Sequence, residues 1–221
     1  MITSSILLML VTFNRRLPVA MARNQWAPGI LWICGVKLKV TGLENLDTSQ
    51  PYVFVANHQS YLDIPFLFNA IPINLYFIAK KEIKWIPFIG WYMMATGMIF
   101  IDRSNRIKSI ASLNKSAKLV HDGKSVLLFP EGTRSRDGYL ADFKKGPFKL
   151  AEKAQVPVVP VGIMEDGHSF ELNKMKSTKV VVNVGSPSEK NGLEHPVWIN
   201  QVHDEVAKLS GRTKYLSLKK N

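Results

Sequence analysis

The chain has 221 residues and carries 29 lysines and arginines against 17 aspartates and glutamates, a formal net charge of +12 at pH 7. Its hydrophobic fraction of 46% and charged fraction of 21% are ordinary for a globular protein, which excludes disorder throughout. The single cysteine, Cys34, excludes an intrachain disulfide and a metal site built from cysteines. The basic surplus favours an anionic partner: a nucleic acid, an anionic membrane surface or a phosphorylated substrate.

The first 34 residues have the composition of a membrane-associated helical segment. Residues 1–14 and 24–36 carry no charged side chain, and arginines lie between the two stretches. Both are shorter than the roughly 20 apolar residues of a transmembrane helix. A secretory signal has basic residues before its apolar stretch, and none precedes residues 1–14. These stretches can either pack in the protein core or associate with a membrane. We expect residues 1–34 to form a helical leader in the headgroup layer, because a free N-terminal helix has little protein to pack against, and residues 35–221 to form a separate α/β domain.

The rest of the chain alternates strand-like and helix-like segments. Apolar alternation and short apolar runs predict strands at 36–40, 52–56, 75–79, 98–101, 125–129, 156–161 and 179–184. Helices are expected at 60–70, 80–95, 104–121, from Gly146 onward, and at 197–209. This order predicts an α/β fold with a mostly parallel sheet flanked by helices.

Two apolar segments allow more than one interpretation. Residues 85–101 carry no charge but contain Pro87, Gly90 and Gly97, and they suit either core packing or an interfacial helix. The strand at 156–161 contains Pro157 and Pro160, which favours a position at the edge of the sheet because proline cannot donate to a neighbouring strand.

A histidine and an aspartate follow the strand at 52–56. His58 and Asp63 are five residues apart, so they do not share a helix face. A loop that turns into a helix can still bring them together, and His58 would then accept a proton through one ring nitrogen while Asp63 holds the other. The alternative is a capping box in which Ser60 and Asp63 serve only the start of the helix.

Two further polar segments also follow predicted strands. Residues 97–103 end in Asp102 and Arg103, whose guanidinium suits a phosphate, although a local ion pair on a surface turn is the alternative. Residues 128–136 (LFPEGTRSR) combine backbone amides near a glycine with a hydroxyl and two arginines, which fits an anion cradle or a solvated basic loop. The Lys-Ser/Thr ending of a nucleotide-binding P-loop is missing.

Together with the block at 156–161, these segments resemble in their order and spacing the 1-acylglycerol-3-phosphate acyltransferase family of glycerolipid synthesis. Members carry a histidine and an aspartate separated by four residues, here His58 and Asp63. They also carry a block ending in Ile-Asp-Arg, here 97–103, and a Pro-Glu-Gly-Thr-Arg block, here 130–134. The resemblance covers roughly residues 36–185.

The resemblance implies an activity and a set of site residues. A fatty acyl group would move from acyl-CoA or acyl carrier protein to the free hydroxyl of 1-acyl-sn-glycerol-3-phosphate (lysophosphatidate), giving phosphatidic acid, with no metal and no cofactor beyond the donor. His58 would be the general base and Asp63 its partner, because histidine is the side chain that changes charge near neutral pH. Arg103, Thr133 and Arg134 would hold the acceptor phosphate. Glu131 would accept a hydrogen bond from a glycerol hydroxyl. The expected substrate-binding residues are Arg103, Glu131, Gly132, Thr133 and Arg134.

Two other functions remain open at this point. One is a sister acyltransferase that uses glycerol-3-phosphate, another lysophospholipid or a lyso-aminolipid as acceptor. The other is a nonenzymatic binder of anionic surfaces, although the sequence has no RNA-binding aromatic motif or zinc-finger spacing, so we expect no nucleic-acid partner. Because the donors are cytosolic, we expect a monotopic or peripheral enzyme on the cytosolic face of a membrane bilayer, the bacterial inner membrane.

Overall fold

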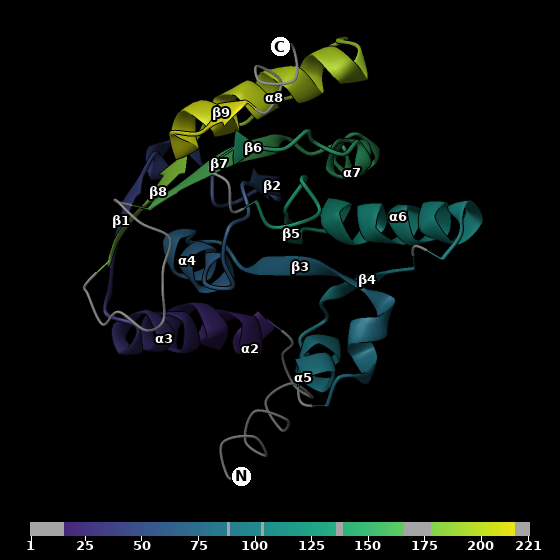
Figure 1. The fold of residues 1–221 in the computed structure, drawn as a ribbon. Helices are drawn as coiled ribbons and strands as arrows, with labels where there is room; N and C mark the ends of the chain where they lie inside the picture. The colour runs from purple at the N-terminus through teal and green to yellow at the C-terminus, as the bar shows by residue number, and fades with distance from the viewer. Residues whose placement is uncertain (1–15, 88, 103, 136–138, 166–177, 215–221) are drawn as a thin grey trace.

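A seven-stranded sheet runs through the centre of the structure, a computed structural model that describes residues 16–87, 89–102, 104–135, 139–165 and 178–214 (Figure 1). The strand order is β1-β8-β7-β2-β5-β3-β4, and all neighbours are parallel except β7 and β8. The predicted mostly parallel sheet is thereby confirmed. The strands are β1 (Val36–Thr41), β2 (Val53–Ala56), β3 (Leu75–Lys80), β4 (Ile99–Ile101), β5 (Ser125–Leu128), β7 (Val158–Glu165) and β8 (Thr178–Val184).

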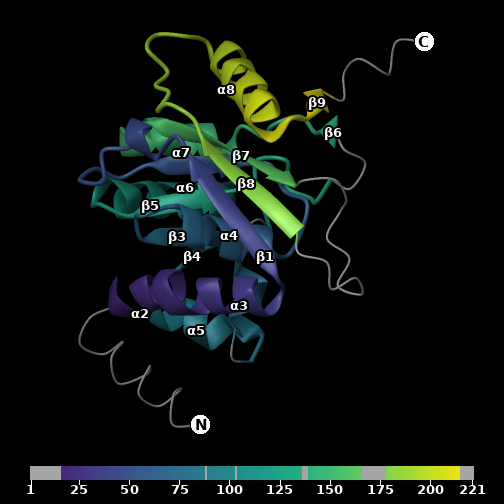
Figure 2. The ribbon, with the colours of Figure 1, turned by 90° about the vertical axis from the view of Figure 1, so that its left-hand side faces the viewer.

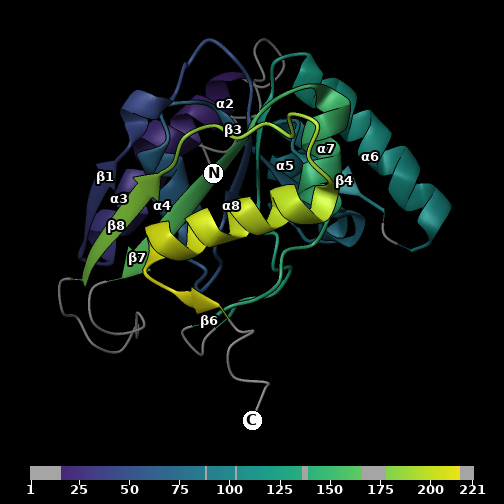
Figure 3. The ribbon, with the colours of Figure 1, turned by 90° about the horizontal axis from the view of Figure 1, so that it is seen from above.

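Helices cover both faces of this sheet. On one face lie α6 (Arg106–His121), α7 (Gly146–Ala154) and α8 (His195–Ser210). On the other lie α4 (Asp63–Ala70) and the N-terminal helices α2 (Arg16–Met21) and α3 (Ala27–Ile33), joined by a π-helical turn, Ala22–Trp26 (Figures 1 and 3). The remaining elements are the 3-10 turns Leu43–Asn45 and Lys81–Trp85, helix α5 (Ile89–Ala95), and the short strand pair β6 (Tyr139–Leu140) and β9 (Thr213–Lys214).

The described part of the N-terminal segment packs against the sheet domain. Val19, Ala22, Ala27 and Leu31 are buried, and α3 contacts α4 and β1. The Arg23 guanidinium donates to the carbonyl of Pro72 at 2.7 Å. Residues 16–33 therefore have more protein to pack against than a free leader would, whereas residues 1–15 lie outside the described residues. None of the helices in the described part of the chain is long and apolar enough to cross a bilayer.

The helix expected at 80–95 is broken in two. A 3-10 turn covers Lys81–Trp85, Ile86 is extended with φ −75° and ψ 118°, and α5 begins at Ile89. Pro87 explains the break, because the residue before a proline is pushed out of the α region. The two pieces then pack closely: a Cβ on Gly90 would collide with the carbonyl oxygens of Ile83 and Lys84.

The edge position expected for the proline-containing strand is wrong. β7 lies between β8 and β2, inside the sheet. Val53 on β2 bonds the carbonyl of Pro157, so the backbone groups of Pro160 point to the β8 side of β7 and not to β2. There Pro160 lies at the end of the β7–β8 pairing, one position beyond Val184, and its carbonyl accepts from the Gly185 amide at 2.8 Å.

Candidate active site

The His58–Asp63 pair sits beyond the carboxyl end of β2, the strand between β7 and β5. The buried side chain of Asn57 fixes the chain as it leaves β2, because its amide bonds both the N–H and the carbonyl of Ile163 on β7, at 2.7 and 3.0 Å. The loop then turns into α4, whose first residue is Asp63. His58 Nδ1 lies 2.7 Å from Asp63 Oδ2, and Asp63 is fully buried. The predicted pairing is therefore present in the structure.

Asp63 combines the two roles that the sequence left as alternatives. Its Oδ2 accepts from the amides of Gln59 at 2.7 Å and Ser60 at 3.0 Å as well as contacting the His58 ring. The bond from Ser60 is one half of a capping box. The Ser60 hydroxyl instead accepts from Leu62, two residues on. One carboxylate thus holds the loop and the imidazole together, so replacing it must affect both the stability of the loop and the orientation of the ring.

The imidazole of His58 is held on one edge and one face. Its ring stacks on Phe129, with centroids 3.9 Å apart and planes 13° apart, and its side chain is 19% exposed. Because Asp63 is an acceptor at Nδ1, the ring proton belongs on that nitrogen and the lone pair on Nε2. Within the part of the chain that the structure describes, Nε2 has no hydrogen-bond partner. This arrangement can take a proton from a group that approaches Nε2.

The loop after β5 is bonded to the main chain of the His58 loop. Glu131 is 4% exposed; its Oε1 accepts from the His58 amide at 2.8 Å and its Oε2 from the Ala141 amide at 3.0 Å. Burial raises the pKa of Glu131 above its ordinary value of 4.5, although both amides act in the opposite direction. The Ser135 amide also donates to the His58 carbonyl, at 2.9 Å. The main chain at His58 is therefore held at its amide and at its carbonyl.

The rest of this loop carries the predicted cradle residues. Gly132 has φ +77°, and the ammonium of Lys144 occupies the space that a Cβ there would need. Thr133 is exposed. Arg134 Nη2 donates to the Tyr61 hydroxyl at 2.9 Å, and its guanidinium lies 3.7 Å from the centroid of the Tyr61 ring. Arg134 is thus placed beside the loop that carries His58.

The predicted Asp102–Arg103 segment follows β4, at the same edge of the sheet. Asp102 forms an ion pair with Lys81 at 2.9 Å, which holds the pKa of its carboxyl well below the usual range. Its amide donates to the Ser112 hydroxyl on α6 at 3.1 Å. Arg103 lies outside the described residues. Among the described residues, no group of three or more His, Cys, Asp or Glu side chains is placed to hold a metal ion.

Comparison with known proteins decides the family. Residues 37–164 match the sequence model of the Acyltransferase family, and this range contains every predicted site residue. The chain belongs to the Acyltransferase family. The resemblance found in the four motifs is confirmed.

Several relatives of this chain carry more specific names. The 1-acyl-sn-glycerol-3-phosphate acyltransferase of Saccharomyces cerevisiae is 46% identical over 130 residues, 58% of this chain and 43% of the relative. The alpha form from Homo sapiens is 34% identical over 193 residues, 86% of this chain and 65% of the relative. The crystal structure of the 1-acyl-sn-glycerophosphate acyltransferase from Thermotoga maritima superposes with a TM-score of 0.74 at 28% identity, covering 96% of this chain and 90% of that one. The chain spans about half the length of the curated relatives it matches.

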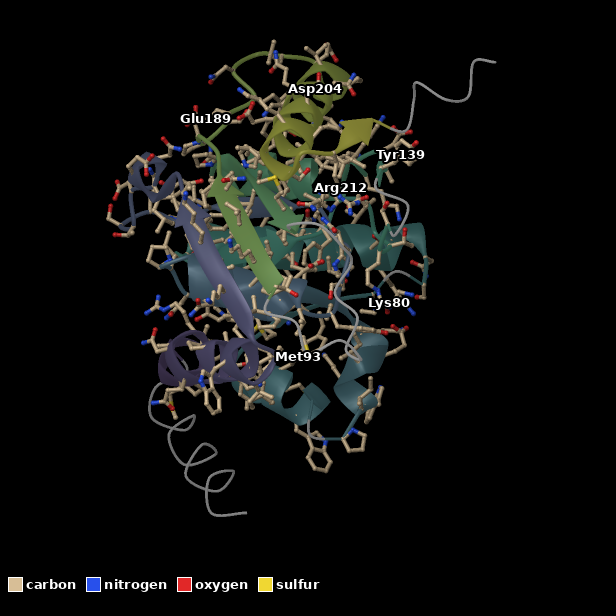
Figure 4. All side chains as sticks on the ribbon, turned by 60° about the vertical axis from the view of Figure 1, so that its left-hand side comes forward. Lys80, Met93, Tyr139, Glu189, Asp204 and Arg212 are labelled. Atoms are coloured by element: carbon tan, nitrogen blue, oxygen red, sulfur yellow. The ribbon has the colours of Figure 1, made fainter. Side chains whose placement is uncertain are left out.

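Sequence reasoning missed the contacts that support the loops of the candidate site from behind. Helix α8 and the residue just before β9 hold the segment that bonds Glu131: His203 Nε2 lies 3.2 Å from the Ala141 carbonyl, and Arg212 Nη1 donates to the Tyr139 carbonyl at 3.1 Å. Figure 4 shows Arg212 and Tyr139 close together, well above Lys80 at the end of β3. His203 and Arg212 lie 62 and 73 positions from their partners and outside any motif, so the sequence offered no signal for them.

Proposed function

We propose that the chain transfers a fatty acyl group from acyl-CoA or acyl carrier protein to 1-acyl-sn-glycerol-3-phosphate, giving phosphatidic acid. The observation that carries the proposal is the 2.7 Å contact between His58 Nδ1 and the buried Asp63, with Nε2 left without a protein partner among the described residues. The names of the relatives support the acceptor, because they specify 1-acyl-sn-glycerol-3-phosphate.

The chemistry needs one base and no covalent intermediate. His58 Nε2 takes the proton of the acceptor hydroxyl while that oxygen attacks the thioester carbonyl. Asp63 keeps the lone pair on Nε2 and stabilises the imidazolium that forms. The new C–O bond replaces the C–S bond, and the proton passes from His58 to the leaving thiolate. A thioester is already activated, so the reaction can proceed without an acyl-enzyme.

The acceptor phosphate would bind at the loop after β5. Arg134 offers a guanidinium beside the His58 loop, and the exposed Thr133 offers a hydroxyl next to the left-handed turn at Gly132. Arg103 is assigned to the same phosphate from its sequence motif alone. Thr133 and Arg134 lie on the loop that bonds the main chain of His58, which places them near the imidazole that would receive the acceptor hydroxyl.

For Glu131 we propose a different role from the one expected from the sequence. Each of its oxygens accepts from a backbone amide, so we assign it the positioning of His58 instead of a contact with a glycerol hydroxyl. Its burial, at 4% exposure, supports this assignment because a substrate would reach it only with difficulty.

The proposed location is the cytosolic face of a membrane, the bacterial inner membrane. Helices α2, α3 and α5 lie side by side at one end of the molecule, and the Tyr92 hydroxyl of α5 donates to the Pro18 carbonyl of α2 at 3.2 Å (Figures 1 and 2). Tryptophans favour the headgroup layer because they combine an apolar ring with a polar N–H. Exposed apolar side chains gather on α3, α5, the π-helical turn before α3 and the segment before α5: Trp26, Trp32, Ile33, Trp85, Ile86, Trp91 and Met94.

A purified-enzyme assay with a labelled acyl thioester and a panel of acceptors tests the function. We expect labelled phosphatidic acid from 1-acyl-sn-glycerol-3-phosphate, with at least about tenfold lower kcat/KM for glycerol-3-phosphate, lysophosphatidylcholine and a lyso-aminolipid. Such a ratio corresponds to one charge-assisted or apolar contact. Preferential acylation of another acceptor would contradict the proposal and identify a sister acyltransferase instead.

A further inference from the structure

Helices α6 and α7 present a basic surface that the proposed chemistry does not use. α6 carries no acidic residue, and its exposed face includes Lys108, Lys115 and Lys118. On α7, Lys149 and Lys153 are exposed, and the single acid of that helix, Glu152, is paired with Lys190 at 2.7 Å and His195 at 3.1 Å. Figure 3 shows the two helices side by side, and the Lys118 and Lys153 side chains line one hollow between them.

This surface, the α6–α7 face, also has apolar contact points. Ile107 is 80% exposed and Ile110 is 48% exposed, and both lie on the solvent side of α6 together with Lys115 and Lys118. The hollow beside them measures about 400 Å³ and is lined by Asn114, Ala117, Lys118, His121, Lys153 and Gln155. Exposed isoleucines ringed by like charges are typical of a surface that meets a protein of opposite charge.

The position of the α6–α7 face relates it to the site. α6 begins five residues after β4 ends, and α7 directly follows Lys144 and Lys145, whose segment bonds the loop after β5 through Lys144 N–H and the Pro130 carbonyl at 3.0 Å. Both helices therefore start at the edge of the sheet where His58 lies and run away from it, so that the hollow lies at their far ends. A partner seated along them can reach the site only with an extended arm.

We propose that the α6–α7 face docks an acyl carrier protein, a small acidic protein that presents the acyl thioester on a long flexible phosphopantetheine arm. This inference rests on the proposed acyl transfer and names the donor carrier. The charge of the face complements an acidic surface, and the isoleucines supply the apolar contact that charge alone lacks.

Two other occupants fit the face less well. A bilayer contacts α2, α3 and α5 in the proposed orientation, and α3 lies on the opposite face of the sheet from α6 and α7 (Figures 1 and 3). The phosphates of coenzyme A would sit in the hollow at the C-terminal ends of two helices, where the outward-pointing carbonyls oppose an anion. A protein can instead place its carboxylates along the helix flanks, at the ends of the lysine side chains.

Charge reversal on α6 tests the docking. Lys115→Glu with Lys118→Glu should weaken binding of holo-acyl carrier protein, measured by calorimetry at low salt, on the order of tenfold or more. Lys37→Glu with Lys39→Glu makes the same change of charge on the exposed side of β1 and should leave that binding nearly unchanged. Ile107→Ser should also weaken binding without any change of charge.

Assays with two donors separate this inference from the proposed function. With acyl carrier protein as donor, the Lys115→Glu/Lys118→Glu enzyme should lose kcat/KM by about the factor lost in binding, and with acyl-CoA it should match the parent. The inference is overturned if the parent does not bind the carrier protein, if both charge-reversal pairs bind it equally, or if turnover with the two donors falls equally. Absence of acyl transfer from either donor by the parent enzyme would instead contradict the proposed function, and the binding measurement would still decide the docking.

Discussion

At the scale of single residues, the site depends on contacts between two loops. Arg134 is not a free surface arginine, because Tyr61 accepts a hydrogen bond from it and lies under its guanidinium. Tyr61 itself is 76% exposed, so little else explains an aromatic side chain there. We interpret Tyr61 as a positioning residue that keeps Arg134 beside the His58 loop.

Replacing Tyr61 should therefore affect the acceptor more than the chemistry. A cation–π contact at an exposed site contributes about 0.5–1 kcal/mol, so Tyr61→Ala should raise the KM for 1-acyl-sn-glycerol-3-phosphate about fivefold while kcat and the KM of the donor change little. Tyr61→Phe keeps the ring, so the KM of this variant for 1-acyl-sn-glycerol-3-phosphate should stay close to that of the parent. Steady-state kinetics with each substrate varied in turn measure both. Equal kinetics for the alanine variant and the parent would remove Tyr61 from this role.

Glu131 makes a prediction about stability and pH. Burial raises its pKa in the folded protein above 4.5, so between 4.5 and the folded pKa the folded state binds more protons than the unfolded state. The contribution of this carboxyl to the unfolding free energy must then fall as the pH rises through that window. Glu131→Gln removes the titration, so the difference in thermal midpoint, parent minus variant, should shrink from pH 4.5 upward. A difference that grows with pH would mean that the amide bonds outweigh burial.

At the scale of elements, the exposed aromatic side chains on α3 and α5 stand apart from the other exposed apolar residues. Trp32 is 83% exposed and Trp91 57%, and they belong to helices that meet at one end of the fold. The buried face of the N-terminal segment holds it on the domain, while the exposed face contacts the bilayer in our proposal. The same segment can thus be both part of the core and a membrane contact.

Removing these tryptophans should release the protein from lipid. Trp32→Ser with Trp91→Ser should lower binding to anionic vesicles at least about tenfold, since burying one large apolar side chain contributes about 1.5–3 kcal/mol. Ile107→Ser, an equally exposed apolar change on α6, serves as the control and should bind vesicles like the parent. Vesicle cosedimentation measures both. If the two variants bind alike, the aromatic end of the molecule is not its membrane contact.

The elements were largely predictable from sequence, with two exceptions. Periodicity and turn residues located every strand of the large sheet. The break at Ile86 has a local cause in Pro87, whereas the inner position of Pro160 depended on tertiary packing that periodicity does not contain. The closeness of His58 and Asp63 followed from their positions at a strand end. The contact of Glu131 with the His58 amide did not, because it joins residues 73 positions apart through the main chain.

At the scale of the whole molecule, the sheet separates three surfaces with different partners. The aromatic end formed by α2, α3 and α5 faces lipid in our proposal, the α6–α7 face meets the acyl donor, and the strand ends between them carry His58. The net charge of +12 suits two anionic partners, a lipid surface and an acidic protein. Each surface can be altered separately, which makes the account testable part by part.

The catalytic role of His58 is the central claim, and kcat of His58→Ala with 1-acyl-sn-glycerol-3-phosphate tests it most directly. The substitution removes the ring but keeps the main-chain bonds to Glu131 and Ser135, so the fold should survive, as circular dichroism and the thermal midpoint can verify. Asp63→Asn is a less direct probe, because Asp63 also holds the loop. General base catalysis typically contributes about 10²–10⁴-fold, and we predict a loss of that size in kcat. A folded His58→Ala enzyme with near-normal kcat would contradict the account.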